Sequence, residues 1–153
     1  LRDKYKIKNT SDFYMVGGMG HTASVALGYS LSNKKKTICI DGDGSLLMHL
    51  GSIKTAGSFA SENFKYIVLN NNSHDSVGGQ NTYANDIDFE KLSKSLGFKK
   101  FYSIKNDINL KTNIQKFLKG SSLNFLEVKV SNSKIKKLPR PTNLIKIKNL
   151  FMK

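Results

Sequence analysis

The segment TICIDGDGS, residues 37–45, places an apolar run of mainly β-branched residues directly before two Asp-Gly pairs. A second run, YIVLN at 66–70, leads into two further asparagines, Asn71 and Asn72. Both runs are almost continuously apolar, which is typical of strands covered on both faces in a parallel sheet. A longer amphipathic segment separates them. This alternation predicts an α/β domain.

The same alternation continues along the rest of the chain. Further strands are expected at 101–104 and 124–130, and helices at 21–31, 46–60, 88–96 and 109–118. The order α-β-α-β-α-β-α-β predicts a three-layer α/β/α fold around a mainly parallel sheet. We treat residues 1–153 as a single domain with a basic C-terminal tail at 131–153, which carries both prolines. The start at Leu1 suggests further residues upstream.

Charge and cysteine content argue against several classes of protein. Lys and Arg number 25 against 11 Asp and Glu, a net charge of +14 that could attract nucleic acid or an acidic membrane. The lysines form short scattered clusters without an Arg-rich stripe among aromatics, so no nucleic-acid partner is expected. The single cysteine, Cys39, cannot build a disulfide framework within the chain. No apolar run approaches the roughly 18 residues that a membrane span needs, and we expect a cytoplasmic protein.

Polar groups gather where the first two predicted strands end. Gly42, Asp43 and Gly44 follow the first strand, and 25 residues separate Gly44 from Asn70 at the end of the second. Ligands of open parallel sheets bind at these strand ends, and carboxylate, amide and carbonyl oxygens suit Mg²⁺. Each piece alone is an ordinary turn or cap. Together they predict a site for Mg²⁺ and a diphosphate, and the glycine-rich turn at 16–21 could also cradle phosphate.

The residues between 71 and 86 form a polar loop without an apolar period. Connections in compact domains are usually much shorter, and long ones are normally functional or disordered. The loop directly follows the second strand, so it is expected to belong to the site.

The pattern GDG, 25 residues, then NN resembles the signature of thiamine diphosphate enzymes. The stretches GGMGHTASVALG (17–28), IDGDGSLLMHLGS (40–52) and VLNNNSHDSVGGQ (68–80) resemble phosphonopyruvate decarboxylases, with sulfopyruvate decarboxylase a near relative. The likeness covers nearly the whole chain, including LPRPT at 138–142. It implies the diphosphate-binding fold of these enzymes, thiamine diphosphate and Mg²⁺ as cofactors, and carboxy-lyase activity.

Carried over residue by residue, the resemblance implies that Asp43, Asn71 and the backbone carbonyl of Ser73 bind Mg²⁺, which leaves Asn70 a structural role. A bulky apolar residue at the position of Met19 would support the bent conformation of the cofactor. Two positions depart from the common pattern, Gly18 in place of Ser and Asn72 in place of Gly. The residues implied to contact the cofactor or its metal are Gly18, Met19, Gly20, His21, Gly42, Asp43, Gly44, Ser45, Asn71 and Ser73.

His74 and Asp75 are the candidate catalytic residues, because they follow the predicted metal loop and could meet the substrate or relay protons. Ser76 and Gln80 share that loop. The activating glutamate of the family is expected on a pyrimidine-binding domain or subunit. Of the chain's own glutamates, Glu62 lies near the end of a predicted helix remote from the strand ends, Glu90 lies in a later helix and Glu127 within the last strand. The resemblance therefore implies a partner domain and a homo- or hetero-oligomer.

The expected reaction converts 3-phosphonopyruvate to phosphonoacetaldehyde and CO₂, a step in phosphonate biosynthesis. One alternative is the β subunit of sulfopyruvate decarboxylase, which acts on sulfopyruvate to give sulfoacetaldehyde and whose two cofactor-binding domains are separate chains. Another is a non-catalytic domain that binds the cofactor alone. The sequence leaves open the anionic group of the substrate, whether the chain is a natural subunit or a fragment, and the role of the basic tail.

Overall fold

The computed structural model describes residues 11–106, 108–132 and 141–152. The chain divides into two compact units, one of Gly18–Ser133 and the other of Leu1–Gly17 together with Lys134–Lys153. The first unit carries the sheet, and all of the predicted site residues, from Gly18 to Asp75, lie within it.

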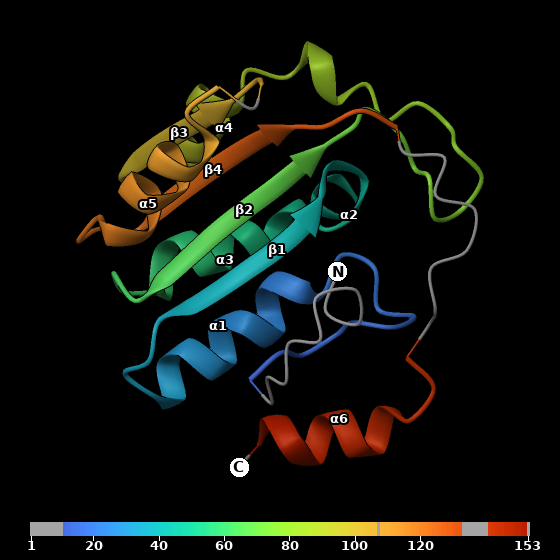
Figure 1. Ribbon diagram of the computed structural model, residues 1–153, viewed down its shortest axis with the longest axis vertical. Helices are drawn as coiled ribbons and strands as arrows, with labels where there is room; N and C mark the ends of the chain where they lie inside the picture. The colour runs from blue at the N-terminus through green and yellow to red at the C-terminus, as the bar shows by residue number, and fades with distance from the viewer. Residues whose placement is uncertain (1–10, 107, 133–140, 153) are drawn as a thin grey trace. The chain divides into compact units, whose positions relative to one another are not determined.

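The four strands are β1 (Thr37–Gly42), β2 (Phe64–Asn70), β3 (Lys100–Ile104) and β4 (Asn124–Lys129). They form one parallel sheet in the order β1-β2-β4-β3, which confirms the predicted strands (Figure 1). Because all four strands are parallel, their carboxyl ends lie along one edge of the sheet. β1 and β2 are direct neighbours, as the strand-end hypothesis requires.

The predicted helices are present, with one correction. They are α1 (Thr22–Ser32), α2 (Asp43–Met48), α3 (Leu50–Phe59), α4 (Phe89–Leu96) and α5 (Leu110–Lys119). The single helix expected at 46–60 is wrong, because His49 (φ −142°, ψ 53°) separates α2 from α3. The break brings His49 against the backbone of Gly20, where an added Cβ would lie 2.8 Å from the His49 Cβ. The hydroxyl of Ser52 donates to the carbonyls of both residues.

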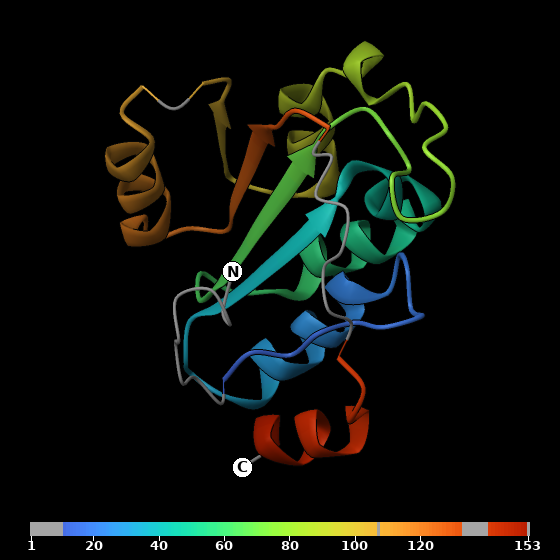
Figure 2. The ribbon, with the colours of Figure 1, turned by 45° about the vertical axis from the view of Figure 1, so that its right-hand side comes forward.

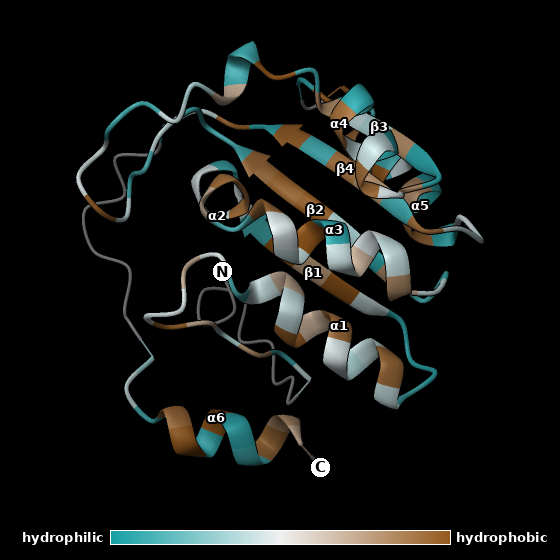
Figure 3. Ribbon diagram, turned by 180° about the vertical axis from the view of Figure 1, so that it is seen from behind, coloured by the Kyte–Doolittle hydropathy of each residue, from teal (hydrophilic) through white to brown (hydrophobic). Residues whose placement is uncertain are grey.

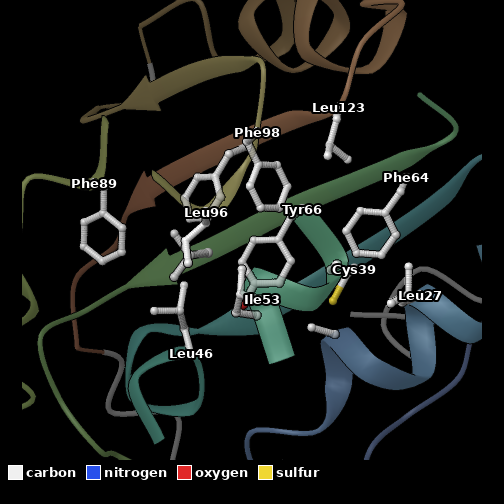
Figure 4. Packing of buried hydrophobic residues seen from close by; sticks show 14 of the residues in the cluster. Leu27, Cys39, Leu46, Ile53, Phe64, Tyr66, Phe89, Leu96, Phe98 and Leu123 are labelled. Atoms are coloured by element: carbon white, nitrogen blue, oxygen red, sulfur yellow. The ribbon is translucent and has the colours of Figure 1, made fainter. Parts of the chain in front are cut away.

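The main hydrophobic core lies between one face of the sheet and helices α1, α3 and α4. Tyr66 of β2 and Phe125 of β4 are fully buried at its centre, with ring centroids 5.2 Å apart. Figure 4 shows Tyr66 and Phe98 together with residues of α1 and α3. Cys39 of β1 is buried in this core, and burial raises the pKa of its thiol.

The opposite face of the sheet packs on α5, around the buried Phe117, Ile104 and Leu126 (Figure 2). This second cluster reaches β2, β3 and β4. On β1 the side chains that alternate with the buried Cys39 stay open to solvent, since Ile38 is 44% and Ile40 is 56% exposed. The strands are coloured largely as hydrophobic in Figure 3, in contrast to the mixed surfaces of the helices.

The second unit contains α6 (Leu144–Phe151), a helix that was not among the predicted elements. Its N-cap is Asn143, whose side chain accepts a hydrogen bond from the backbone of Lys146. The ring of Phe151 packs on Phe13 at a centroid distance of 5.2 Å. The expected basic tail at 131–153 is thus partly helical, while its residues 133–140 lie outside the described residues. The prediction of a single domain stays a prediction.

Candidate functional site

Asp43 lies at the carboxyl end of β1, as the first residue of α2, with no loop between strand and helix. Its side chain is 1% exposed, and its Oδ2 accepts a hydrogen bond from the hydroxyl of Thr82 in the 71–86 loop. Asp43 makes no ion pair with another described residue. A buried carboxylate is costly unless it is paired or binds a cation. Asp43 therefore fits the role of a metal ligand.

The loop after β2 is organised by its own polar side chains. Asn71 donates through Nδ2 to Oδ2 of Asp75 at 2.9 Å, and the Ser73 hydroxyl donates to Oδ1 of Asp75 at 2.7 Å. The backbone N–H of Ser73 donates to Oδ1 of Asn71 at 3.1 Å. Two of the three predicted metal ligands are thus held in one turn by the carboxylate of Asp75.

His74 leaves this turn in a different direction, toward the start of α2. A Cβ built at Gly44 would lie 2.3 Å from Nδ1 of His74 and 2.6 Å from its Cε1, so only glycine leaves room for the ring. Nδ1 of His74 is buried and has no hydrogen-bond partner among the described residues. Buried polar atoms normally have a partner. An unsatisfied ring nitrogen beside Gly44 is therefore a position at which a ligand group could be received.

The glycine turn before α1 meets the start of α2 through one hydroxyl. The backbone N–H of Gly20 donates to Oγ of Ser45 at 2.8 Å. Gly20 has φ +85°, a left-handed conformation that favours glycine, and it also approaches the His49 side chain. The exposed ring of His21 lies against the ring of His49 in a tilted arrangement, with ring centroids 4.8 Å apart, and its Nδ1 lies 3.2 Å from the carbonyl oxygen of Met19.

The structure brings together most of the residues that the sequence singled out. Gly20 meets Ser45, Gly44 meets His74, and Asp43 meets the 71–86 loop through Thr82. Gly18, Met19 and Gly42 are half-buried beside these contacts in the chain. His74 and Asp75 are not paired with each other, since Asp75 is engaged by Asn71 and Ser73. A direct proton relay between the two has no support in the described contacts.

Four residues have contacts at this edge of the sheet that were not predicted from the sequence: Thr82, Asn85, Glu127 and Lys129. Glu127 is 5% exposed and receives a hydrogen bond from Nδ2 of Asn70 at 2.8 Å. A lone acidic residue inside the otherwise apolar start of NFLEVKV is the signal that could have identified it. Thr82 and Asn85 carry no such signal, because their partners come from distant parts of the chain.

Asp41, the first aspartate of DGDG, belongs to the core rather than to the site. The hydroxyl of Tyr66 donates to Oδ2 of Asp41 at 3.1 Å. Burial, and then the charge of Asp41, raise the pKa of Tyr66 well above its ordinary value. The phenol therefore stays protonated and keeps donating this hydrogen bond.

The donor set at the strand ends is not of the histidine and cysteine type. Among the described residues, no three His, Cys, Asp or Glu side chains gather where they could hold a metal ion. The buried carboxylate of Asp43 is instead tied through Thr82 to the loop that carries Asn71 and Ser73, and oxygen donors of this kind suit a hard cation that shares its coordination sphere with phosphate and water. The residues present therefore fit Mg²⁺ bound together with a diphosphate.

Comparison with known proteins gives the family. Residues 2–128 match the family described as thiamine pyrophosphate enzyme, C-terminal TPP binding domain. The chain belongs to this family. Thiamine pyrophosphate, also called thiamine diphosphate, is thus the cofactor of the domain, and the strand-end residues 42–45 and 71–75 lie within the matched range.

Two groups of relatives share this domain. The chain is 44% identical over 87 residues to a phosphonopyruvate decarboxylase of Streptomyces viridochromogenes, covering 57% of this chain and 22% of that protein. It is 39% identical over 98 residues to the sulfopyruvate decarboxylase subunit beta of Methanothermobacter thermautotrophicus, covering 63% of this chain and 53% of that protein. The chain thus spans between about a fifth and a half of the length of these relatives.

A solved structure supports the fold. The X-ray structure of a Mycobacterium smegmatis protein, assigned as a thiamin diphosphate-dependent enzyme, superposes with a TM-score of 0.58 and 20% identity. The superposition covers 76% of this chain and 23% of that one. Within the described residues, no helix of this thiamine pyrophosphate-binding domain is both long and apolar enough to cross a membrane.

Proposed function

We propose that this chain supplies the diphosphate- and Mg²⁺-binding half of the active site of a thiamine diphosphate-dependent 2-oxo-acid decarboxylase. The observation that carries the proposal is the buried carboxylate of Asp43. It lies at the end of β1 without an ion-pair partner among the described residues, and Thr82 holds it to the loop that follows β2. A cation shared with a diphosphate would compensate this charge.

In this proposal Asp43, the amide oxygen of Asn71 and the backbone carbonyl of Ser73 hold Mg²⁺. The bond from Asn71 to Asp75 supports the assignment, because the NH₂ group donates it and Oδ1, which accepts one bond from the Ser73 backbone, keeps a second lone pair for the metal. Asp75 then acts through these two residues. Outer-shell partners of this kind orient metal ligands and tune metal affinity.

The remaining predicted residues bind the diphosphate and the substrate. Gly20 and Ser45, joined by a hydrogen bond, form one side of the diphosphate cradle, with Gly18, His21, Gly42 and Gly44 around it. Met19 supports the bent conformation of the cofactor. His74, whose Nδ1 lacks a partner among the described residues, receives an anionic oxygen of the substrate or cofactor. Bound thiamine diphosphate supplies the electron sink for the loss of CO₂ from the 2-oxo acid.

The substrate we propose first is 3-phosphonopyruvate, with phosphonoacetaldehyde and CO₂ as products. The resemblance of the 68–80 stretch and the name of the relative at 44% identity favour it. The alternative is sulfopyruvate, favoured by relatives named as the beta subunit of sulfopyruvate decarboxylase, of which the chain covers a larger share. Both substrates are three-carbon 2-oxo acids with a second anionic group, so a direct comparison of the two must decide.

The partner we propose is a pyrimidine-binding domain or subunit that contributes the activating glutamate, in a homo- or hetero-oligomer. Glu62 precedes β2, at the end of the strand opposite to the site, Glu90 is paired with Lys94 on α4, and Glu127 is bonded to Asn70 and Lys129. None of these carboxylates is therefore placed to activate a cofactor at the strand ends. The beta-subunit relatives imply a companion chain in the same way.

The test is calorimetric titration of thiamine diphosphate with Mg²⁺ into the chain, alone and mixed with a candidate pyrimidine-binding partner. Asp43→Asn should weaken Mg²⁺-dependent binding at least about tenfold, because an amide replaces the only buried carboxylate of the proposed ligand set. Asp88→Asn is the matched control, since Asp88 is an exposed N-cap of α4. Equal binding by wild type and Asp43→Asn would overturn the metal assignment. Cofactor binding without decarboxylation by the mixture would favour a non-catalytic domain.

A further inference from the structure

Glu127 is a buried carboxylate in the middle of the sheet, close to the proposed metal loop. It lies on β4 beside Val68 of β2 and Ser103 of β3. Its Oε1 accepts a hydrogen bond from Nδ2 of Asn70 at 2.8 Å and lies 3.1 Å from Nζ of Lys129. Its Oε2 lies 3.5 Å from the hydroxyl of Ser103. Because Glu127 is 5% exposed, its carboxylate depends on these partners to compensate for the water that it loses on burial.

The bonds of Glu127 belong to a closed ring that anchors the 71–86 loop to the sheet. Oδ1 of Asn70 accepts from the backbone of Asn72 at 3.1 Å, and Oδ1 of Asn72 accepts from the backbone of Asn85 at 3.1 Å. Oδ1 of Asn85 accepts from Nζ of Lys129 at 2.7 Å, and Lys129 pairs with Glu127. Both ends of the loop are therefore tied to neighbouring residues of β4.

The carboxylate of Glu127 determines which way the Asn70 amide points in this ring of hydrogen bonds. An ionised carboxylate can only accept hydrogen bonds, so Glu127 requires the NH₂ side of the Asn70 amide. The oxygen of that amide then faces the backbone N–H of Asn72. Asn72 has φ 57°, a conformation that costs energy for a side-chain-bearing residue and needs such support. The orientation of Asn70 thus fixes how the chain enters the turn of Asn71 and Ser73.

We propose that Glu127 is a positioning residue for the metal-binding loop and acts through Asn70. This inference rests on the proposed function, in which Asn71 and Ser73 bind Mg²⁺. Glu127 does not touch the metal, the cofactor or the substrate, and it is distinct from the activating glutamate expected on the partner. Removal of its acceptor oxygen should free the Asn70 amide to rotate and release the entry to the loop.

The test compares Glu127→Leu, which cannot accept, with Glu127→Gln, which keeps one acceptor oxygen for Asn70. Glu90→Leu is the matched control, because Glu90 is an exposed glutamate bonded to Lys94 at 2.7 Å. One readout is amide hydrogen exchange of Asn72 and Asn85 in the full chain without cofactor. The other is the Mg²⁺ concentration needed to half-saturate the chain with thiamine diphosphate.

The expected result is faster exchange confined to residues 71–86 and a roughly tenfold or larger increase in the Mg²⁺ requirement for Glu127→Leu. Glu127→Gln should recover most of both, and Glu90→Leu should match wild type. Unchanged loop exchange in Glu127→Leu would overturn the inference, as would exchange that rises equally in all four strands. If Glu127→Leu fails to fold, Lys129→Met decides by the same exchange readout, because it breaks the ring at a side chain that is 31% exposed.

The two proposals fail in different ways. If the wild-type chain binds no thiamine diphosphate with Mg²⁺, even with a partner, the proposed function fails. The exchange experiment uses no cofactor, and unchanged loop exchange in Glu127→Leu would refute the anchoring of the loop on its own. If the wild type binds and Glu127→Leu binds with the same Mg²⁺ requirement, the positioning role fails while the proposed function stands.

Discussion

Replacement of Gly44 by alanine should weaken cofactor binding while it leaves the free energy of unfolding nearly unchanged. The new Cβ would lie 2.3 Å from Nδ1 of His74, where ordinary van der Waals contacts begin near 3.4 Å. The ring must therefore withdraw by about 1 Å. Since the ring is the end of a side chain on a loop, it can yield without a shift of the sheet.

The free energy of unfolding should change little in Gly44→Ala. Gly44 lies within α2, where alanine is favoured over glycine by up to about 1 kcal/mol. The displaced ring offsets part of this gain, so we expect a net change within about 1 kcal/mol. The affinity for thiamine diphosphate with Mg²⁺ should instead fall at least about tenfold, or 1.4 kcal/mol, because the new methyl group displaces the His74 ring from its position against the start of α2.

Urea unfolding followed by circular dichroism and calorimetric titration of the cofactor measure the two effects. Gly28→Ala is the control, because Gly28 is also helical and a Cβ there meets nothing within 4 Å. It should gain the same helix stability and keep full affinity. Wild-type affinity in Gly44→Ala would refute a role of His74 in the site. A large loss of stability would refute the argument that its ring is free to move.

Three further predictions concern the scaffold. Gly57→Ala should destabilise the fold by about 1–3 kcal/mol in urea unfolding, because its Cβ would lie 1.9 Å from a backbone carbonyl oxygen at the end of α4, which cannot yield; wild-type stability would contradict this. Thr82→Val should lower the free energy of unfolding by about 1–3 kcal/mol without cofactor. The loss should be smaller with Mg²⁺ and thiamine diphosphate, because the cation then compensates the charge of Asp43. An equal loss under both conditions would speak against metal binding at Asp43. The backbone N–H of Lys91 holds the pKa of Asp88 below its ordinary value. Asp88→Ala should therefore lower the free energy of unfolding at pH 7. The difference between wild type and variant should disappear as the pH falls from about 3.9, the ordinary pKa of Asp, through the lowered pKa of Asp88. A difference in stability that does not change with pH would refute the cause.

The strands and the strand-end chemistry could be predicted because local sequence determines them. TICID and YIVLN are apolar enough to require a covered parallel sheet, and the residues that follow them must then meet at one edge. The break at His49 could not be predicted, because LLMHLGS contains no helix breaker before Gly51 and the contact of His49 with Gly20 joins residues that are distant in the chain.

The polar contacts of the site depend on residues that are distant in the chain. Thr82 reaches Asp43 across 39 positions, and Asn70 reaches Glu127 across 57. Neither pair has a spacing that a sequence motif would reveal. The position of Glu127 in the last strand follows from the sequence. Its contacts with Asn70 and Lys129, which tie the loop of Asn71 and Ser73 to the sheet, depend on the fold.

The open side of β1 has a practical consequence for handling the chain. Ile38 and Ile40 present an apolar surface on β1, which is an edge strand, and this arrangement favours self-association. The net charge of +14 opposes it, since copies of the chain repel one another at low ionic strength. Salt shortens the range of this repulsion to about 8 Å at physiological strength and leaves the apolar attraction intact. The colloidal stability of the isolated chain should therefore fall as salt is added, and dilute buffers of low ionic strength are the conditions in which to study it.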